Sequence, residues 1–136
     1  AILEKGGRHD VPAYYGVQKV RFDMYRKLQP ILDKYDVLVC PTMAIPGLKA
    51  QHSDLDPNFT INGKKVSAFI GWIMTYPFNV LSQCPVMSVP TGFSASTNVP
   101  TGMQIVGRTF DDLSVFQAAA AFEAATSPWA HRRPDL

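Results

Sequence analysis

The stretch from Cys84 to Ala125 constrains the fold of this chain more than any other part of it. Its short apolar run Val86–Val89 is typical of a buried strand, which the turn residues Pro90–Gly92 should end. A second apolar run, Met103–Val106, follows a connection rich in Ser, Thr, Asn and Pro. Acidic residues then precede the Ala-rich segment Leu113–Ala125, which predicts a helix with negative charge at its positive end. The stretch therefore predicts strand, turn, strand and helix.

The first forty residues predict a long helix and a strand. Asp10 and Pro12 mark the start of the helix, and Pro30 should kink or loosen its last turn. Apolar residues recur on one helix face at a period close to 3.6 residues, at Val17, Val20, Met24, Leu28, Ile31 and Leu32. Val37–Cys40 is a short β-branched run typical of a strand covered on both faces.

Two further elements follow a long connection over residues 41–58 that is rich in Pro, Gly and polar residues. An Asn-Gly pair at 62 and 63 stands between alternating apolar positions and predicts a hairpin over residues 59–66. Residues 67–82 should form a second helix, with Pro77 bending or interrupting it.

This order of elements places the chain in the α/β class. We expect helices packed on a mixed β-sheet, with residues 1–136 forming a single unit. The sheet should bury Val37, Leu38, Val39, Val86, Val89, Ile105 and Val106, and the last helix should pack Val115, Phe116 and Phe122 over them.

Composition excludes several classes of partner. A chain of 136 residues with 46% hydrophobic content can form one domain, burying roughly two-thirds of its unfolded surface. The formal net charge of +2 comes from scattered residues, and the basic segment 131–133 is too short for a nucleic-acid footprint. No apolar stretch reaches membrane-spanning length, so neither nucleic acid nor membrane is an expected partner. Cys40 and Cys84 adjoin apolar runs, which favours free buried thiols and a cytoplasmic location, with a disulfide between them left open.

Four short segments carry the clearest family signal in the chain. P-V-M-S-V-P-T-G-F at 85–93 is followed by G-M-Q-I-V-G-R-T-F-D-D at 102–112. Y-D-V-L-V-C-P-T at 35–42 and T-Y-P-F-N at 75–79 precede them. In this order they resemble the C-terminal end of the amidase signature family. The resemblance covers nearly the whole chain, and it implies a C-terminal fragment of the larger α/β/α fold of that family.

The catalytic residues that this resemblance implies are absent from the chain. The family is known for acyl transfer by a serine that a second serine and a lysine activate, in segments far upstream. This chain contains no G-S-S, no G-x-S-x-G and no Ser-x-x-Lys, and it begins at Ala1 without an initiator Met. We therefore expect a fragment without catalytic residues, whose partner is the N-terminal part of the same protein.

The remaining reactive side chains are better explained as structural. His9, His52 and His131 stand in polar segments without metal-ligand spacing and should be solvated. The adjacent acidic residues at 111 and 112 should cap the last helix rather than bind a metal. Gln104 alternates with apolar neighbours on a strand and should point away from the core. The sequence thus predicts no metal and no cofactor.

Five residues are candidates for substrate binding: Thr42, Met43, Trp72, Tyr76 and Asn79. Thr42 and Met43 directly follow the first strand, together with Pro41 and Ile45, and ligands of α/β proteins bind where strands end. Trp72 and Tyr76 offer large, partly apolar surface for an acyl or aryl group, with ordinary core packing of Trp72 left open.

Asn79 should act through its side-chain amide, which can donate and accept hydrogen bonds at once. We expect it to bind backbone groups of residues 42–45 or 82–84, repairing a helix that Pro77 interrupts. A structural role and substrate contact both stay open. The spacing from Asn79 to Pro85 also departs from the commoner family pattern N-x-x-G-x-P, having one residue more and no Gly. The substrate and the subfamily therefore stay open.

The function that the resemblance implies is hydrolysis of carbon–nitrogen amide bonds through an acyl-enzyme. A small-molecule amide would be the substrate of the complete protein. The first alternative is an amidotransferase subunit that supplies ammonia for transamidation of charged tRNA. The second is a non-catalytic α/β module for binding or assembly, descended from amidases. Surface that the upstream part would cover leaves a homo-oligomer open as well.

Overall fold

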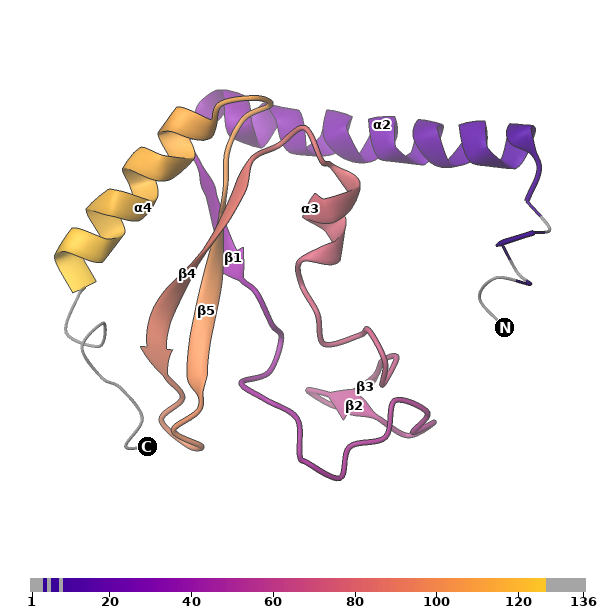
Figure 1. Cartoon of the computed structure of the whole chain (residues 1–136), viewed down its shortest axis with the longest axis vertical. Helices are drawn as coiled ribbons and strands as arrows, with labels where there is room; N and C mark the ends of the chain where they lie inside the picture. Colours follow the sequence, from indigo (N-terminus) through magenta and orange to yellow (C-terminus); the bar gives the residue numbers. More distant parts are fainter. Residues whose placement is uncertain (1–3, 5, 8, 127–136) are drawn as a thin grey trace.

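The computed structural model of the protein describes residues 4, 6, 7 and 9–126 and has the α/β architecture that the sequence predicts (Figure 1). Its elements are α2 (Val11–Lys34), β1 (Leu38–Pro41), β2 (Thr60–Ile61), β3 (Lys64–Lys65), α3 (Tyr76–Val80), β4 (Val86–Phe93), β5 (Pro100–Val106) and α4 (Asp112–Thr126). Within the described residues no helix is both long enough and apolar enough to cross a bilayer.

The three apolar runs predicted as strands lie side by side in one sheet of order β1-β5-β4. Both pairings are antiparallel, and Gln104 of β5 stands between Cys40 of β1 and Ser88 of β4. In the part of the chain that the structure describes, β5 therefore has a neighbour on each side, while β1 and β4 are edge strands.

The helices α2 and α4 pack on the sheet through two separate core clusters. The C-terminal half of α2 packs with the segment between α3 and β4 over Val106, in a cluster made of Leu28, Leu32, Leu81, Cys84 and Val106. The helix α4 covers the other face through a cluster made of Ile105, Val115 and Ala119. Neighbouring residues of a strand point to opposite faces, so Ile105 and Val106 serve one cluster each.

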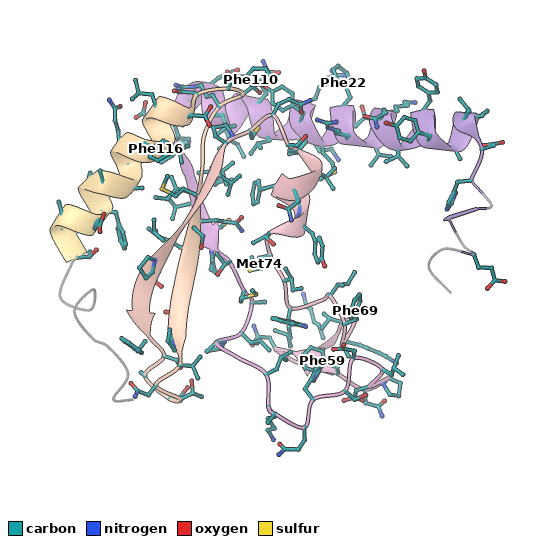
Figure 2. The ribbon with its side chains drawn as sticks, viewed as in Figure 1. Phe22, Phe59, Phe69, Met74, Phe110 and Phe116 are labelled. Carbon is teal, nitrogen blue, oxygen red and sulfur yellow. The ribbon has the colours of Figure 1, made fainter. Side chains whose placement is uncertain are left out.

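The predicted core is right at the central strand and wrong at the edges. Ile105, Val106 and Val115 are buried, whereas Val37, Leu38, Val89 and Phe122 are half-buried. Val39, Val86 and Phe116 are exposed, by 49%, 41% and 62%. The two valines are exposed because β1 and β4 each lack a described neighbour on one side, and Phe116 lies on a side of α4 that no described element covers (Figure 2).

The long helix begins where predicted, and its N-terminal half extends beyond the sheet (Figure 1). Asp10 is the N-cap, and its Oδ1 accepts from the Ala13 N–H at 2.9 Å. The helix continues through Pro30 to Lys34. Of its predicted apolar face, described residues bury Leu28 and Leu32 and partly cover Met24, whereas Ile31 is 42% exposed. Val17 and Val20 are exposed, and Phe22 projects from the outer side of the helix (Figure 2).

The second predicted helix is mostly wrong, since residues 68–72 form turns, Ile73 lies in a β-bridge and only α3 is helical. Pro77 lies in the first turn of α3, where a missing N–H has no intrahelical partner to lose. It thus starts a short helix instead of bending a long one. A side chain at Gly71 would meet the Ser67 carbonyl oxygen at 2.6 Å, so this tight turn requires glycine.

The predicted hairpin is confirmed, and the predicted end of β4 is wrong. Asn62 and Gly63 take positive φ angles of 50° and 74° between β2 and β3. The strand β4 does not stop at Pro90 but runs on to Phe93, with a register irregularity between Pro90 and Gly92. An edge strand tolerates proline because one row of its N–H groups needs no partner.

Candidate functional site

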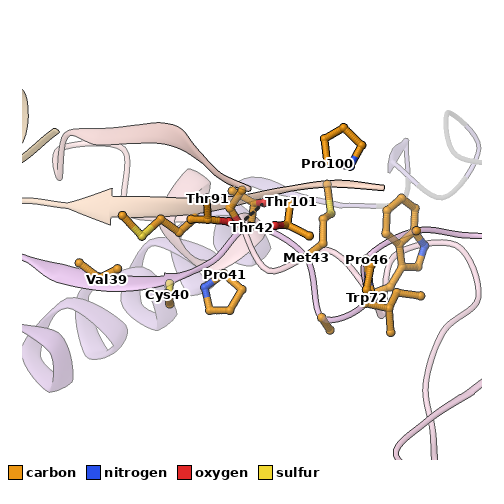
Figure 3. A pocket seen from close by; sticks show the side chains of 15 residues that line it. Val39, Cys40, Pro41, Thr42, Met43, Pro46, Trp72, Thr91, Pro100 and Thr101 are labelled. Carbon is orange, nitrogen blue, oxygen red and sulfur yellow. Dashed lines mark hydrogen bonds between the residues drawn. The ribbon is translucent and has the colours of Figure 1, made fainter. Parts of the chain in front are cut away.

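A cavity of about 780 Å³ opens at the end of β1, beside the start of β5 (Figure 3). Its walls are residues 39–47, Trp72, Thr91 and residues 100–103. The antiparallel pairing of Pro41 with Met103 brings the first and last of these segments together.

The cavity is apolar and uncharged, with hydroxyl groups as its polar side chains. None of the lining residues carries an acidic or basic side chain. The Thr42 hydroxyl donates to the Gly102 carbonyl at 3.0 Å. The Thr101 hydroxyl donates to the Gly92 carbonyl at 3.3 Å and lies 3.0 Å from the Thr91 hydroxyl. These contacts occupy the hydroxyl protons, so the threonines present methyl groups and oxygen lone pairs to a ligand.

Main-chain hydrogen bonds hold the wall that carries Met43 and Trp72. The Ala44 N–H donates to the Trp72 carbonyl at 2.8 Å, and the Met74 N–H donates to the Thr42 carbonyl at 2.9 Å. Met43 and Ile73 form an isolated antiparallel bridge between these two bonds. The segment after β1 is therefore paired with the segment before α3.

Gln104 is buried, with 1% exposure, and does not point away from the core as the alternation predicted. Its Nε2 donates to the Pro41 carbonyl at 3.1 Å and to the Met74 carbonyl at 3.0 Å. The prediction failed because β5 is the central strand, covered on both faces. Its Oε1 is buried and has no hydrogen-bond partner among the described residues.

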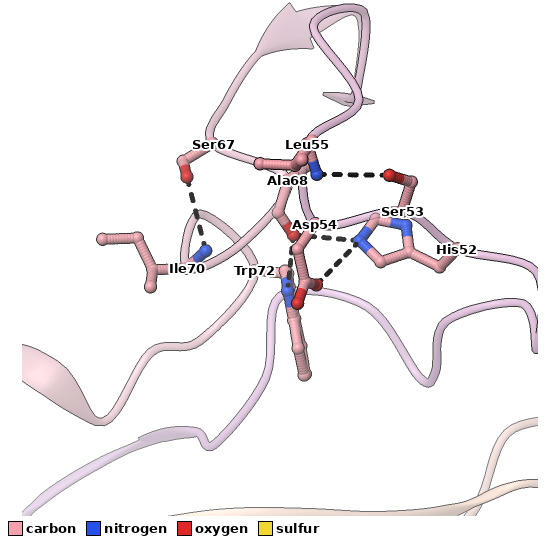
Figure 4. Close-up of polar contacts among 8 residues, drawn as sticks. All are labelled: His52, Ser53, Asp54, Leu55, Ser67, Ala68, Ile70 and Trp72. Carbon is pink, nitrogen blue, oxygen red and sulfur yellow. Dashed lines mark hydrogen bonds and ion pairs between the residues drawn. The ribbon is translucent and has the colours of Figure 1, made fainter. Parts of the chain in front are cut away.

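A second hydrogen-bonded group holds the Trp72 ring through its indole N–H (Figure 4). The Ala68 carbonyl accepts from Trp72 Nε1 at 3.1 Å and lies 2.9 Å from His52 Nε2. The His52 side chain is only 12% exposed, 3.8 Å from an Asp54 carboxylate oxygen and edge-on to the Phe59 ring. The expectation of a solvated His52 is therefore wrong, because the long loop folds back over it.

The other titratable candidates are as predicted where the structure describes them, except that Cys40 is half-buried instead of buried. His9 is exposed, and His131 lies outside the described residues. Both cysteines are free, with Cys84 buried and Cys40 half-buried at the cavity wall. Burial raises the pKa of the Cys40 thiol, and the neighbouring Gln104 side chain opposes this less strongly.

Burial likewise raises the pKa of the Cys84 thiol, against a smaller effect of Thr109. Both groups therefore stay protonated at neutral pH, which makes them poor nucleophiles. Asp111 Oδ1 accepts from the Ser114 N–H at 3.2 Å, which confirms helix capping. The described residues contain no group of side chains that could hold a metal ion.

The structure brings three of the five candidate binding residues together: Thr42, Met43 and Trp72 line the cavity. Tyr76 and Asn79 lie exposed on α3 and do not line it. The Asn79 side chain also makes none of the predicted hydrogen bonds with described residues. The Thr75 carbonyl accepts from both the Phe78 and Asn79 N–H groups, at 3.1 Å each, so Pro77 leaves no gap there for an amide to fill.

Sequence reasoning missed the part of the site that comes from β4 and β5. Thr91, Thr101 and Met103 line the cavity, and Gln104 braces it. The only signal for them was the strand register, because pairing of β1 with β5 sets residues 100–103 beside residues 39–42.

Comparison with known proteins gives one consistent family. The family model described as Amidase matches residues 5–116. The A subunit of glutamyl-tRNA(Gln) amidotransferase from Geobacillus kaustophilus is 36% identical over 115 residues, covering 84% of this chain and 21% of that protein. The chain thus spans about a fifth of the length of the curated relatives it matches.

Solved structures agree with this comparison. A bacterial aryl acylamidase of the amidase signature enzymes family superposes with a TM-score of 0.74 and 31% identity, over 96% of this chain and 27% of that one. The A subunit of glutamyl-tRNA(Gln) amidotransferase from Thermotoga maritima gives a TM-score of 0.64 and 32% identity, over 82% of this chain and 22% of that one.

Proposed function

The chain belongs to the amidase family, and from that premise we propose that it is the C-terminal portion of an enzyme that hydrolyses carbon–nitrogen amide bonds. The observation that carries the proposal is the uncharged cavity beside β1 and β5, on a chain that matches the family over residues 5–116. A cavity of this size and polarity fits the acyl or aryl group of a small amide.

In the proposed mechanism this chain binds and orients the substrate. Met43 and Trp72 pack against the hydrophobic group, while Thr42 borders it with a methyl group and an oxygen acceptor. Tyr76 and Asn79 would meet only a substrate group that projects from the cavity toward α3. Holding the amide in one orientation beside a nucleophile lowers the entropic part of the barrier.

The nucleophile would come from upstream residues of the complete protein. By family resemblance, a serine there gives its proton to a second serine, which passes its own proton to a lysine, and the oxygen of the first serine attacks the amide carbon. The amine or ammonia leaves with a proton, and water then hydrolyses the acyl-enzyme to release the acid. None of these steps uses a side chain of this chain as acid, base or nucleophile.

Substrate preference in the protein as its gene encodes it tests the proposal. Anilides and amides with hydrophobic acyl groups should be turned over with higher kcat/KM than amides with a charged group near the carbonyl. Met43→Ala should raise KM for the hydrophobic substrates about tenfold, with kcat less affected. Phe69→Ala is the matched control, because Phe69 is a large exposed apolar residue that does not line the cavity. An unchanged KM in Met43→Ala would refute the binding role.

The second candidate function is that of an amidotransferase subunit, which similarity to the glutamyl-tRNA(Gln) amidotransferase relatives supports. The protein would then release ammonia from glutamine for transamidation of charged tRNA, together with partner subunits. The uncharged lining favours the first proposal, since it offers glutamine no partner for its charged α-groups. Release of ammonia from glutamine, but from no hydrophobic amide, would favour the amidotransferase.

The third candidate, a non-catalytic binding or assembly module, is distinguished by the encoding reading frame. A Gly/Ser-rich signature and a lysine-bearing strand upstream of Ala1 would support an enzyme. A frame that encodes neither would support the module.

A further inference from the structure

Gln104 is the one buried polar side chain among the described residues, and it joins the two segments that form a wall of the cavity. We propose that Gln104 is a positioning residue, whose amide sets the spacing between the end of β1 and the segment before α3 and so shapes the cavity. For substrate binding this inference rests on the proposed function, whereas the bracing itself can be tested without it.

The orientation of the Gln104 amide follows from its partners. Carbonyl oxygens only accept hydrogen bonds, so the two groups near Pro41 and Met74 must both face the NH₂ end. The distances from Nε2 are 3.1 Å and 3.0 Å, which lets each N–H donate to one carbonyl. The side chain comes from the central strand, which is hydrogen-bonded to a neighbouring strand on each side.

The two carbonyls belong to segments that carry the lining residues. Pro41 ends β1 immediately before Thr42 and Met43, and Met74 follows Trp72 by two residues. The segments also pair directly through the bonds between Ala44 and Trp72 and between Met74 and Thr42. The two hydrogen bonds from the buried Gln104 side chain join the same two segments a second time.

The buried amide also has a cost that an apolar residue would avoid. Its Oε1 has no hydrogen-bond partner among the described residues, and a buried acceptor without a partner is destabilising. A methionine of similar shape would leave no such oxygen. We infer that the two N–H donors, rather than packing alone, are what this position requires.

Two variants of Gln104 separate donation from packing. Gln104→Met keeps the volume and removes both donors. Gln104→Glu keeps the shape but faces two carbonyls with a carboxyl group, which can donate only when it is protonated. Burial raises the pKa of such a carboxyl group. A protonated carboxyl group has one O–H, so the Glu variant should regain one of the two hydrogen bonds. It should therefore move part of the way toward wild-type behaviour as the pH falls from about 9 to about 6, and the Met variant should not.

Cys40 reports on the bracing independently of catalysis, because its thiol lies beside Gln104 at the cavity wall. In the protein as its gene encodes it, alkylation by iodoacetamide would be followed by mass spectrometry of the peptide that carries Cys40. Because the Gln104 side chain also lowers the pKa of the Cys40 thiol, the alkylation rate is expressed per thiolate, from its dependence on pH. This rate should be about tenfold higher than in wild type in Gln104→Met, and in Gln104→Glu at high pH. Gln117→Met and Gln117→Glu, on the exposed side of α4, are the matched controls and should match wild type.

Kinetics supply the functional half of the test. If the enzyme hydrolyses hydrophobic amides, both Gln104 variants should raise KM about tenfold with a smaller change in kcat, and the Glu variant should recover in part at lower pH. Unchanged Cys40 alkylation in both variants would overturn the bracing role, whether or not the protein is an amidase. Faster alkylation with unchanged KM would overturn the link to substrate binding. If Gln104→Met does not fold, the pH-dependent recovery of Gln104→Glu decides alone.

Discussion

Position within the sheet decides how much a single side chain contributes to stability. Val106 on β5 is 0% exposed, because it has a strand on each side and α2 above it. Val39 on β1 is 49% exposed, because it lies on an edge strand beside the cavity. Both are β-branched residues within short apolar runs, and the sequence alone treats them alike.

The matched pair Val106→Asp and Val39→Asp should show this difference. Val106→Asp places a carboxylate in an apolar layer without a partner and should cost about 3–5 kcal/mol of unfolding free energy. Val39→Asp keeps access to water and should cost less than about 1 kcal/mol. Urea denaturation followed by tryptophan fluorescence measures both. Equal losses would mean that β1 is not an edge strand in solution.

The two amide side chains at 79 and 104 show how far residue-scale prediction reached. The sequence predicted that the Asn79 amide binds backbone groups of residues 42–45 or 82–84, and it makes neither contact with described residues. In the structure it is the Gln104 amide that binds backbone groups on both sides, at Pro41 and Met74. Gln104 is distant from Pro41 in sequence and lies beside it only through strand pairing. The type of residue decides whether a side chain can donate and accept hydrogen bonds. Which backbone groups it can contact depends on the strand register, which a single sequence does not specify.

Elements were predictable where a local pattern and the tertiary surroundings agree. Apolar runs marked all three strands of the main sheet, and the Asn-Gly pair marked the hairpin. The prediction of a helix over residues 67–82 was mostly wrong, because Gly71 and Pro77 favour turns. An apolar run alone does not distinguish a helix from a packed loop. The prediction that residues 90–92 end a strand was also wrong, because an edge strand accommodates these residues and continues through them.

The start of α4 carries a pH-dependent prediction. Hydrogen bonds from the Ser114 side chain and N–H, with Arg108 nearby, hold the pKa of Asp111 below its ordinary value of 3.8. A carboxyl group with a lowered pKa stabilises the fold above its unfolded-state pKa, and this contribution disappears as the pH falls through the folded-state value. Asp111→Ala should therefore lower the melting temperature at pH 7, and the gap to wild type should close at acid pH.

Thermal melts by circular dichroism across the acid range would measure this gap. Asp23→Ala, a change on the exposed side of α2 and away from any helix cap, is the control. It should not show the difference in melting temperature that Asp111→Ala shows at pH 7. A constant gap for Asp111→Ala at every pH would mean that the charge of this carboxylate does not stabilise α4.

The molecule as a whole exposes much apolar surface for its size. The outer half of α2 exposes Tyr14, Tyr15 and Phe22, and α4 exposes Leu113 and Phe116. The chain also spans about a fifth of the relatives it matches. Both facts support the proposal that upstream residues of a longer protein pack here and bring the nucleophile.

We therefore expect the isolated chain to hydrolyse no amide, because no described side chain at its cavity is an activated nucleophile. Purified chain would be assayed against aliphatic and aromatic amides, beside the longer protein expressed from its gene. Turnover by the isolated chain that disappears in Thr42→Val would contradict this expectation, since it would place a nucleophile within the cavity.

The sheet order β1-β5-β4 also has a consequence for how the chain folds. The strands β4 and β5 are joined by a short loop, so their pairing closes few residues and forms early. Pairing of β1 with β5 must instead close the whole segment that holds the small hairpin and α3. Because the cavity opens where the end of β1 meets the start of β5, we expect it to form only after this longer-range pairing, later than the β4–β5 hairpin.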